Sequence, residues 1–235
     1  MTAVEARGLT KSYVGGDGGH IAVLDDVSLV VARREMVAIV GASGAGKSTL
    51  LHLLGALDRP SSGTVLIGGQ DLAGLADDAV SALRNRTVGF VFQFHHLLRE
   101  FTALENVMMP LRIAGVPEAR ARERALHLLD RVGLAGRVQH RPAELSGGEQ
   151  QRTAVARALA VEPAVLLADE PSGNLDHMNS ERLHDLFAQL TRELDIAMVV
   201  VTHNRSLAAR ADRVLQLEDA HLALVAHGAA LELAT

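Results

Sequence analysis

Apolar residues along most of the chain form short runs, separated by longer segments with helical periodicity. The runs are rich in Val, Ile and Leu, lack polar alternation, and lie at Val37–Val40, Val88–Phe92, Val165–Ala168, Ala197–Val201 and Val214–Leu217. Such runs are typical of parallel strands that are covered on both faces. The alternation therefore predicts an α/β fold with a buried parallel sheet.

Two regions depart from this pattern. Near the N-terminus, Val4–Lys11 and Ala22–Val31 flank the glycine-rich residues 15–19, which predicts an antiparallel hairpin with a flexible loop. From about residue 95 to 160 strand patterns are absent, and Pro117 can begin a helix that Gly133 ends. We therefore expect one domain over residues 1–235, with a core of 1–94 and 161–235 and a helical subdomain of 95–160.

Composition restricts the function further. The 235 residues are 48% hydrophobic and carry a net charge of −5, so the basic excess of a nucleic-acid-binding protein is lacking and no nucleic-acid partner is expected. The chain has no cysteine, which excludes disulfides and thiolate-bound metals. No apolar run approaches the roughly 20 residues of a membrane helix, and Glu5 and Arg7 interrupt the start. We expect a chain that neither spans a membrane nor is exported.

A phosphate-binding loop follows the first buried run. Its pattern G-x-x-x-x-G-K-[ST] and the next residue are supplied by Gly41, Ala42, Ser43, Gly44, Ala45, Gly46, Lys47, Ser48 and Thr49, and an apolar helix is predicted over Leu50–Leu57. Backbone N–H groups of such a loop and the helix N-terminus bind phosphate oxygens. Lys47, one of only two lysines with Lys11, can reach between phosphates.

Two adjacent acids end another buried run. Asp169 is the candidate for the Mg²⁺ side of the site, and Glu170 is the candidate general base that activates water. Ser48 is expected to complete the Mg²⁺ shell through its hydroxyl.

A second element of the same physical kind lies far from the first in the sequence. Ser146, Gly147 and Gly148 precede a helix predicted over Gln151–Ala160, and they offer free backbone N–H groups at a helix start. One nucleotide cannot readily occupy two such elements on different subdomains of one chain. We therefore predict a twofold dimer in which each chain closes over the nucleotide of its partner.

The order of these motifs resembles that of ATP-binding cassette (ABC) ATPases over nearly the whole chain. The motifs are the phosphate loop, Gln93, Leu145–Gln150, Asp169-Glu170, Asn174-Leu175-Asp176 and His203. The resemblance implies a P-loop NTPase fold with a RecA-like core, an antiparallel β subdomain and an inserted helical subdomain. It implies ATP and Mg²⁺ as ligands.

The resemblance also implies roles for single residues. Tyr13 would stack on adenine, and Gln93 would link the metal and water to the helical subdomain. Ser146 and Gly148 would contact the γ-phosphate across a homodimer, Asp176 would couple the two sites, and His203 would contact the γ-phosphate. Simpler interpretations are a strand aromatic for Tyr13, a surface amide for Gln93 and a capping or core histidine for His203.

Two segments narrow the kind of cassette. Phe92–Val107 and Pro171–Asp176 resemble ATP-binding subunits of bacterial lipoprotein-releasing transporters and, more broadly, macrolide-exporter and cell-division relatives. The resemblance implies a peripheral subunit on the cytoplasmic face of the inner membrane, bound to integral membrane transporter subunits. A soluble ATPase of DNA repair or translation is disfavoured because the chain lacks room for coiled-coil arms or a second cassette. A non-hydrolysing module is disfavoured by Glu170.

Two turns depart from the family pattern. Arg34 and Ala220 stand where glycine is common in resembling chains. A residue with a Cβ is strained at positive φ, so the sequence leaves the conformation of these turns open.

Overall fold

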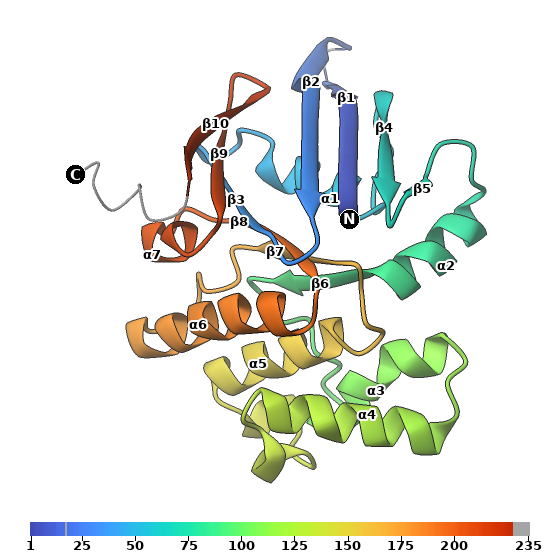
Figure 1. Ribbon diagram of the computed structural model, residues 1–235, viewed down its shortest axis with the longest axis vertical. Coiled ribbons are helices and arrows are strands. Elements are labelled where there is room, and N and C mark those ends of the chain that lie inside the picture. The colour runs from blue at the N-terminus through green and yellow to red at the C-terminus, as the bar shows by residue number, and fades with distance from the viewer. Residues whose placement is uncertain (17, 228–235) are drawn as a thin grey trace.

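The computed structural model describes residues 1–16 and 18–227, and its largest element is a six-stranded sheet (Figure 1). The strand order is β10-β9-β3-β8-β7-β6, with β3 Met36–Val40, β6 Val88–Phe92, β7 Val165–Asp169, β8 Ala197–Val201, β9 Arg213–Glu218 and β10 His221–His227. All neighbours pair in parallel except β10, which runs antiparallel to β9. The five predicted strands are confirmed to within a residue or two at each end.

A second, antiparallel sheet lies beside the first. Its order is β2-β1-β4-β5, with β1 Thr2–Val14, β2 His20–Ala32, β4 Ser62–Ile67 and β5 Gln70–Asp71. The predicted N-terminal hairpin is thus confirmed as β1 and β2, whereas β4 and β5 had no clear sequence signal. Asp17, in the loop expected to be flexible, lies outside the described residues, as does the end of the predicted core segment at 228–235.

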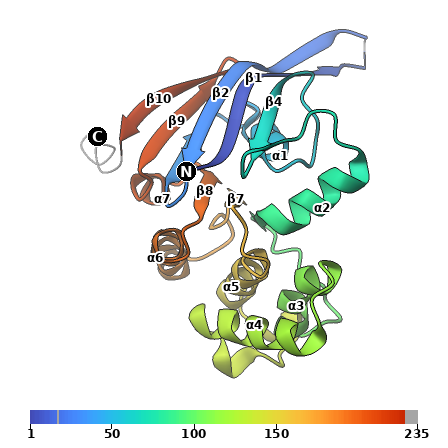
Figure 2. The same cartoon turned by 45° about the vertical axis from the view of Figure 1, so that its right-hand side comes forward.

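The six-stranded sheet separates two apolar cores. Alternate residues of β3 face opposite ways: Val37 and Ile39 pack with the second sheet and helix α1 (Lys47–Leu54), whereas Met36 and Ala38 pack towards the other helices. Helices α5 (Gly147–Ala158) and α6 (His177–Glu193) cover that other face (Figure 2). Helices α1 and α5 therefore lie on opposite faces of the sheet.

The middle of the chain is helical, as predicted, with α3 (Ala103–Ile113) and α4 (Glu118–Arg131) packed against α5. The α4 helix follows Pro117 and ends at Arg131, two residues before Gly133, which has a φ of 72°. Its last carbonyls accept bonds from the N–H groups of Gly133 and Leu134, as in a Schellman cap. Two further helices, α2 (Asp77–Thr87) and α7 (Arg205–Ala209), were not predicted. No helix within the described residues has the length and apolar character needed to cross a membrane.

Two predicted helix boundaries were wrong. The α1 helix begins at Lys47 rather than Leu50, because the last residues of the phosphate loop already form the first turn of the helix. It ends at Leu54, shortly before Ala56 adopts a φ of 55°. The α5 helix begins at Gly147 rather than Gln151 because the Ser146 side chain caps it. Both glycine-rich elements therefore lie at the actual start of their helices.

Candidate functional site

The phosphate loop connects β3 to α1 and presents a helix N-terminus that no side chain caps. Gly46 occupies the N-cap position with a φ of 97°, and a Cβ there would lie 2.8 Å from both Cγ1 and the carbonyl oxygen of Val23. The Lys47 ammonium donates to the carbonyl oxygens of Gly41 (3.0 Å) and Ala42 (2.8 Å). The first N–H groups of α1 and this ammonium are donors of the kind that can bind an anion.

A hollow of about 750 Å³ lies next to this loop. Its walls come from the loop, the start of β2 and the turn between β9 and β10, including Ala42–Ala45, Ile21–Val23 and Gln216–Ala220. A volume of this size falls within the range of small-molecule sites. The phosphate loop thus faces space that can admit a ligand.

The structure brings Glu170 and His203 together at the ends of two adjacent strands. Glu170 directly follows β7, and its N–H donates to the Val201 carbonyl of β8 (2.9 Å). Its carboxylate accepts the backbone N–H of His203 (3.1 and 3.3 Å) and lies 2.8 Å from the His203 Nδ1. Glu170 has a φ of 44°, a strained conformation of the kind found at functional sites.

Gln93 follows β6 and contacts the loop after Glu170. Its Nε2 donates to Asn174 Oδ1 (3.0 Å), and Asn174 Nδ2 donates back to the Gln93 carbonyl (3.3 Å). A Cβ on Gly173 would approach Gln93 Nε2 to 2.9 Å, so a larger residue there would displace the end of the Gln93 side chain. Strands β6 and β7 are parallel neighbours, which places Gln93 and Asp169 at the same edge of the sheet.

Ser146 begins the second glycine-rich element as the N-cap of α5. Its hydroxyl accepts the Glu149 N–H (3.3 Å), and the Glu149 carboxylate accepts the Ser146 N–H (2.8 Å). Hydrogen bonds from the Arg137 guanidinium and, to a smaller extent, from the Ser146 backbone N–H lower the pKa of Glu149 to about 2. Gly148 is buried against α6, where a Cβ would lie 2.7 Å from Asn179 Oδ1.

Asn179 connects the second glycine-rich element to Asp176. The Asp176 carboxylate caps α6 by accepting the Asn179 backbone N–H (2.9 Å) and also accepts its side-chain amide (2.6 Å). Sequence reasoning missed Asn179, although an Asp followed three residues later by a polar side chain at a helix start signals this cap. Ser146–Gly148 and Asp176 therefore form one surface at the starts of α5 and α6.

Tyr13 lies at the end of β1 with 44% of the residue exposed, and its hydroxyl donates to Asp58 Oδ2 (3.0 Å). Lys11 contacts both the Tyr13 ring and the Asp58 carboxylate. The sequence predicted no role for Lys11 or Asp58. Apart from Tyr13, the predicted residues form three groups: the phosphate loop, the Glu170 group with Asp169, His203 and Gln93, and the surface at the starts of α5 and α6. The helices α1 and α5 lie on opposite faces of the sheet, and none of Ser146–Gly148 lines the hollow beside the phosphate loop.

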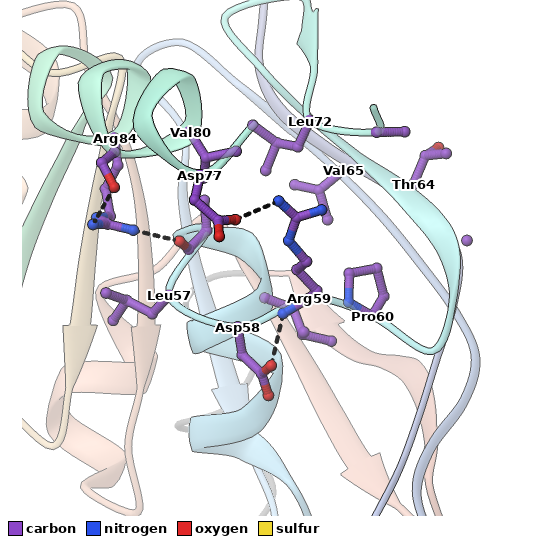
Figure 3. A pocket seen from close by; sticks show the side chains of 15 residues that line it. Leu57, Asp58, Arg59, Pro60, Thr64, Val65, Leu72, Asp77, Val80 and Arg84 are labelled. Atoms are coloured by element: carbon purple, nitrogen blue, oxygen red, sulfur yellow. Dashed lines mark hydrogen bonds and ion pairs between the residues drawn. The ribbon is translucent and has the colours of Figure 1, made fainter. Parts of the chain in front are cut away.

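A separate cavity of about 410 Å³ lies between the end of α1, β4 and α2 (Figure 3). Its charged groups are already paired: Arg59 with Asp77 (2.6 Å), and Arg84 with the Ala56 carbonyl (2.7 Å). None of the predicted site residues lines it.

Comparison with known proteins agrees with the resemblance of the sequence to ABC ATPases. Residues 24–173 match the sequence profile of the ABC transporter family. The "Lipoprotein-releasing system ATP-binding protein LolD" of Geobacter metallireducens is 54% identical over 216 residues, covering 92% of this chain and 96% of the relative. The protein of the same name from Bordetella pertussis is 56% identical over 220 residues, covering 94% and 95%.

A solved structure with the same fold is a dimer. The ATP-binding cassette MJ0796, in a post-hydrolysis state bound to ADP and Pi, matches with a TM-score of 0.85 and 38% identity, covering 93% of this chain and 96% of that one. The expected ABC ATPase fold is therefore confirmed.

Proposed function

The chain belongs to the ABC transporter family as an ATP-hydrolysing subunit, and we propose that it powers the release of lipoproteins from the bacterial inner membrane to a periplasmic carrier. The observation that carries this substrate class is the high identity to relatives named for lipoprotein release, over more than nine-tenths of both chains. A macrolide-exporter or cell-division complex is the second candidate, since those relatives share the broader sequence pattern.

The working unit in this proposal is a homodimer with two shared sites. Helices α1 and α5 lie on opposite faces of one sheet, so a nucleotide on the Gly41–Thr49 loop needs a second chain to reach Ser146–Gly148. The dimeric MJ0796 cassette supports this arrangement. Gly147 contributes a backbone N–H to the element that closes over the partner's γ-phosphate, and Asp176 joins that element to the second site.

Residues of the Mg²⁺ shell are assigned from their donor chemistry and position. Ser48 offers a hydroxyl, Asp169 a carboxylate and Gln93 an amide oxygen, which are the oxygen ligands that Mg²⁺ prefers. Asp169 ends β7, Gln93 follows β6, and Ser48 lies at the start of α1, after the loop that follows β3. The carboxyl ends of these parallel strands meet at one edge of the sheet. Bound there, Mg²⁺ would neutralise charge on the β- and γ-phosphates.

Hydrolysis in this proposal depends on Glu170. Its carboxylate takes a proton from water, the water oxygen attacks the γ-phosphorus, and the bond to the β–γ bridging oxygen breaks to give ADP and phosphate. The His203 backbone N–H donates a hydrogen bond to that carboxylate, and the His203 Nδ1 lies within hydrogen-bond distance of it. Lys47 and His203 stabilise the phosphoryl charge.

Membrane subunits would dock beside Gln93 on the helical subdomain, residues 95–160. In the segment between β6 and α3, three large apolar side chains are exposed: Phe94 (67%), Leu98 (42%) and Phe101 (38%). The Arg157 guanidinium fixes the backbone of this segment by donating hydrogen bonds to the carbonyls of His95 (2.8 Å) and His96 (2.7 Å). This surface would hold the chain at the cytoplasmic face of the inner membrane and transmit ATP-driven closure to its partners.

The decisive experiment is affinity purification of the full chain from membranes, followed by identification of the proteins that co-purify. Lipoprotein-releasing membrane subunits would support the proposal. Recovery of efflux or cell-division subunits instead would transfer the chain to the second candidate.

The shared hydrolytic site is tested with Glu170→Gln. We expect turnover to fall by roughly 10²–10⁴-fold, the range for loss of a general base, while ATP binding persists and the closed dimer accumulates. Gel filtration with ATP and a phosphate-release assay measure the two effects. Turnover at the wild-type rate would remove Glu170 from this role.

A further inference from the structure

A compact cluster of three side chains surrounds the aromatic ring of Tyr13. The Lys11 ammonium lies 4.9 Å from the ring centroid and 2.8 Å from Asp58 Oδ2, and the same carboxylate oxygen accepts the Tyr13 hydroxyl at 3.0 Å. The ring is therefore held at its hydroxyl by an anion, and a cation lies within cation–π range of it.

The Lys11 side chain is only 12% exposed, although it carries a charge. Burying an ammonium is costly unless it is paired and hydrogen-bonded. Here it is satisfied by Asp58, by the Arg59 carbonyl (2.7 Å) and by the Tyr13 ring. Lys11 and Lys47 are the only lysines of the chain, and a compact ammonium can make these contacts where a planar guanidinium would not fit in the same way.

Asp58 is itself fixed in place. Burial would raise the pKa of Asp58, but hydrogen bonds from Lys11, the Arg59 N–H and Tyr13 together lower it. The Arg59 N–H donates to the other carboxylate oxygen at 2.7 Å, and the Arg59 guanidinium contacts Asp77 (Figure 3). It also donates to the Leu75 carbonyl. Asp58 follows the C-terminal end of α1, the helix that begins at the phosphate loop. One helix therefore connects the phosphate loop to the cluster around Tyr13.

We propose that Lys11 and Asp58 are positioning residues that fix the Tyr13 ring for stacking on the nucleobase of ATP. The inference rests on the proposed function, which gives Tyr13 the adenine contact. Tyr13 remains 44% exposed, so the ring keeps open surface for the base. A ring held in one orientation before binding loses less conformational freedom when the nucleotide arrives.

The test compares a ligand that has a base with one that lacks it. Dissociation constants for ADP and for inorganic tripolyphosphate are measured by titration calorimetry on the purified full chain carrying Lys11→Met, Asp58→Asn or Tyr13→Phe. We expect each variant to bind ADP about three- to tenfold more weakly, a loss equal to that of one ordinary hydrogen bond, and to bind tripolyphosphate as the wild type does. Arg7→Met, which breaks an exposed ion pair with Glu5 on the same strand, is the matched control and should change neither constant.

A further variant separates this inference from the proposed function. If Tyr13→Ala binds ADP as tightly as the wild type, the adenine contact itself is wrong. If Tyr13→Ala weakens ADP binding but the three conservative variants do not, positioning by Lys11 and Asp58 is overturned. Equal weakening of ADP and tripolyphosphate would also overturn it, because the effect would then act on the phosphates or on folding rather than on the ring.

Discussion

Replacing Ala220 with glycine is expected to stabilise the protein, although an Ala-to-Gly change within regular structure has the opposite effect. Asp219 and Ala220 form the two-residue turn between β9 and β10, with φ values of 47° and 67°, and the flanking Glu218 and His221 pair across the strands. Positive φ at both central residues defines a type I′ hairpin turn, which favours glycine at the second position.

The magnitude follows from two opposing terms. A residue with a Cβ in the left-handed region costs about 1–2 kcal/mol, which glycine relieves. Glycine also raises the conformational entropy of the unfolded chain, which lowers the free energy of unfolding by about 0.4–1 kcal/mol. The net gain is about 0.5–1 kcal/mol, which corresponds to a rise in Tm of about 1–4 °C for a chain of this size.

Calorimetric or urea unfolding measures the change. Ala223→Gly is the matched control, because Ala223 lies in extended β10 opposite Gln216, and there the substitution is expected to lower stability by about 0.5–1 kcal/mol. Arg34, at a φ of 63° between β2 and β3, should respond to glycine in the same direction as Ala220. If Ala220→Gly lowered Tm as Ala223→Gly does, the reasoning from backbone strain would be refuted.

Three further predictions concern the site. Lys47→Ala should weaken Mg–ATP binding itself, measured by calorimetry, and normal affinity would contradict the phosphate-loop assignment. Ser146→Arg should abolish ATP-dependent dimerisation and turnover but leave ATP binding to the monomer; Ser146→Ala, which loses the same helix cap at a cost of about 1 kcal/mol without adding bulk, should still dimerise. Because the folded pKa of Glu149 is lowered from 4.5 to about 2, its charge stabilises the fold above pH 4.5, and this contribution is lost as the pH falls towards 2. The difference in urea midpoint between wild type and Glu149→Gln should therefore shrink below about pH 4.5, and a difference that stays constant as the pH falls from 4.5 towards 2 would count against the Arg137 and Ser146 contacts.

Local patterns were sufficient for the buried core. The runs at β3, β6, β7, β8 and β9 were predicted because both faces of these strands are covered, which leaves an uninterrupted apolar sequence. The phosphate loop was found for a related reason, since its glycines and Lys47 act through a contiguous strand, loop and helix. Elements with little apolar content, such as α2, which has no buried residue, left no comparable signal.

The sequence by itself determined the class of fold, the phosphate loop and the family, because each is written in consecutive residues or in the order of motifs. Only the tertiary structure decided that Glu170 lies against His203, that Gly148 packs on Asn179, and that Lys11 and Asp58 hold Tyr13. These contacts join residues 31 to 47 positions apart, and no local periodicity encodes which distant side chains meet. Strand pairing and helix packing bring them together, so the chemistry of the site depends on the fold as a whole.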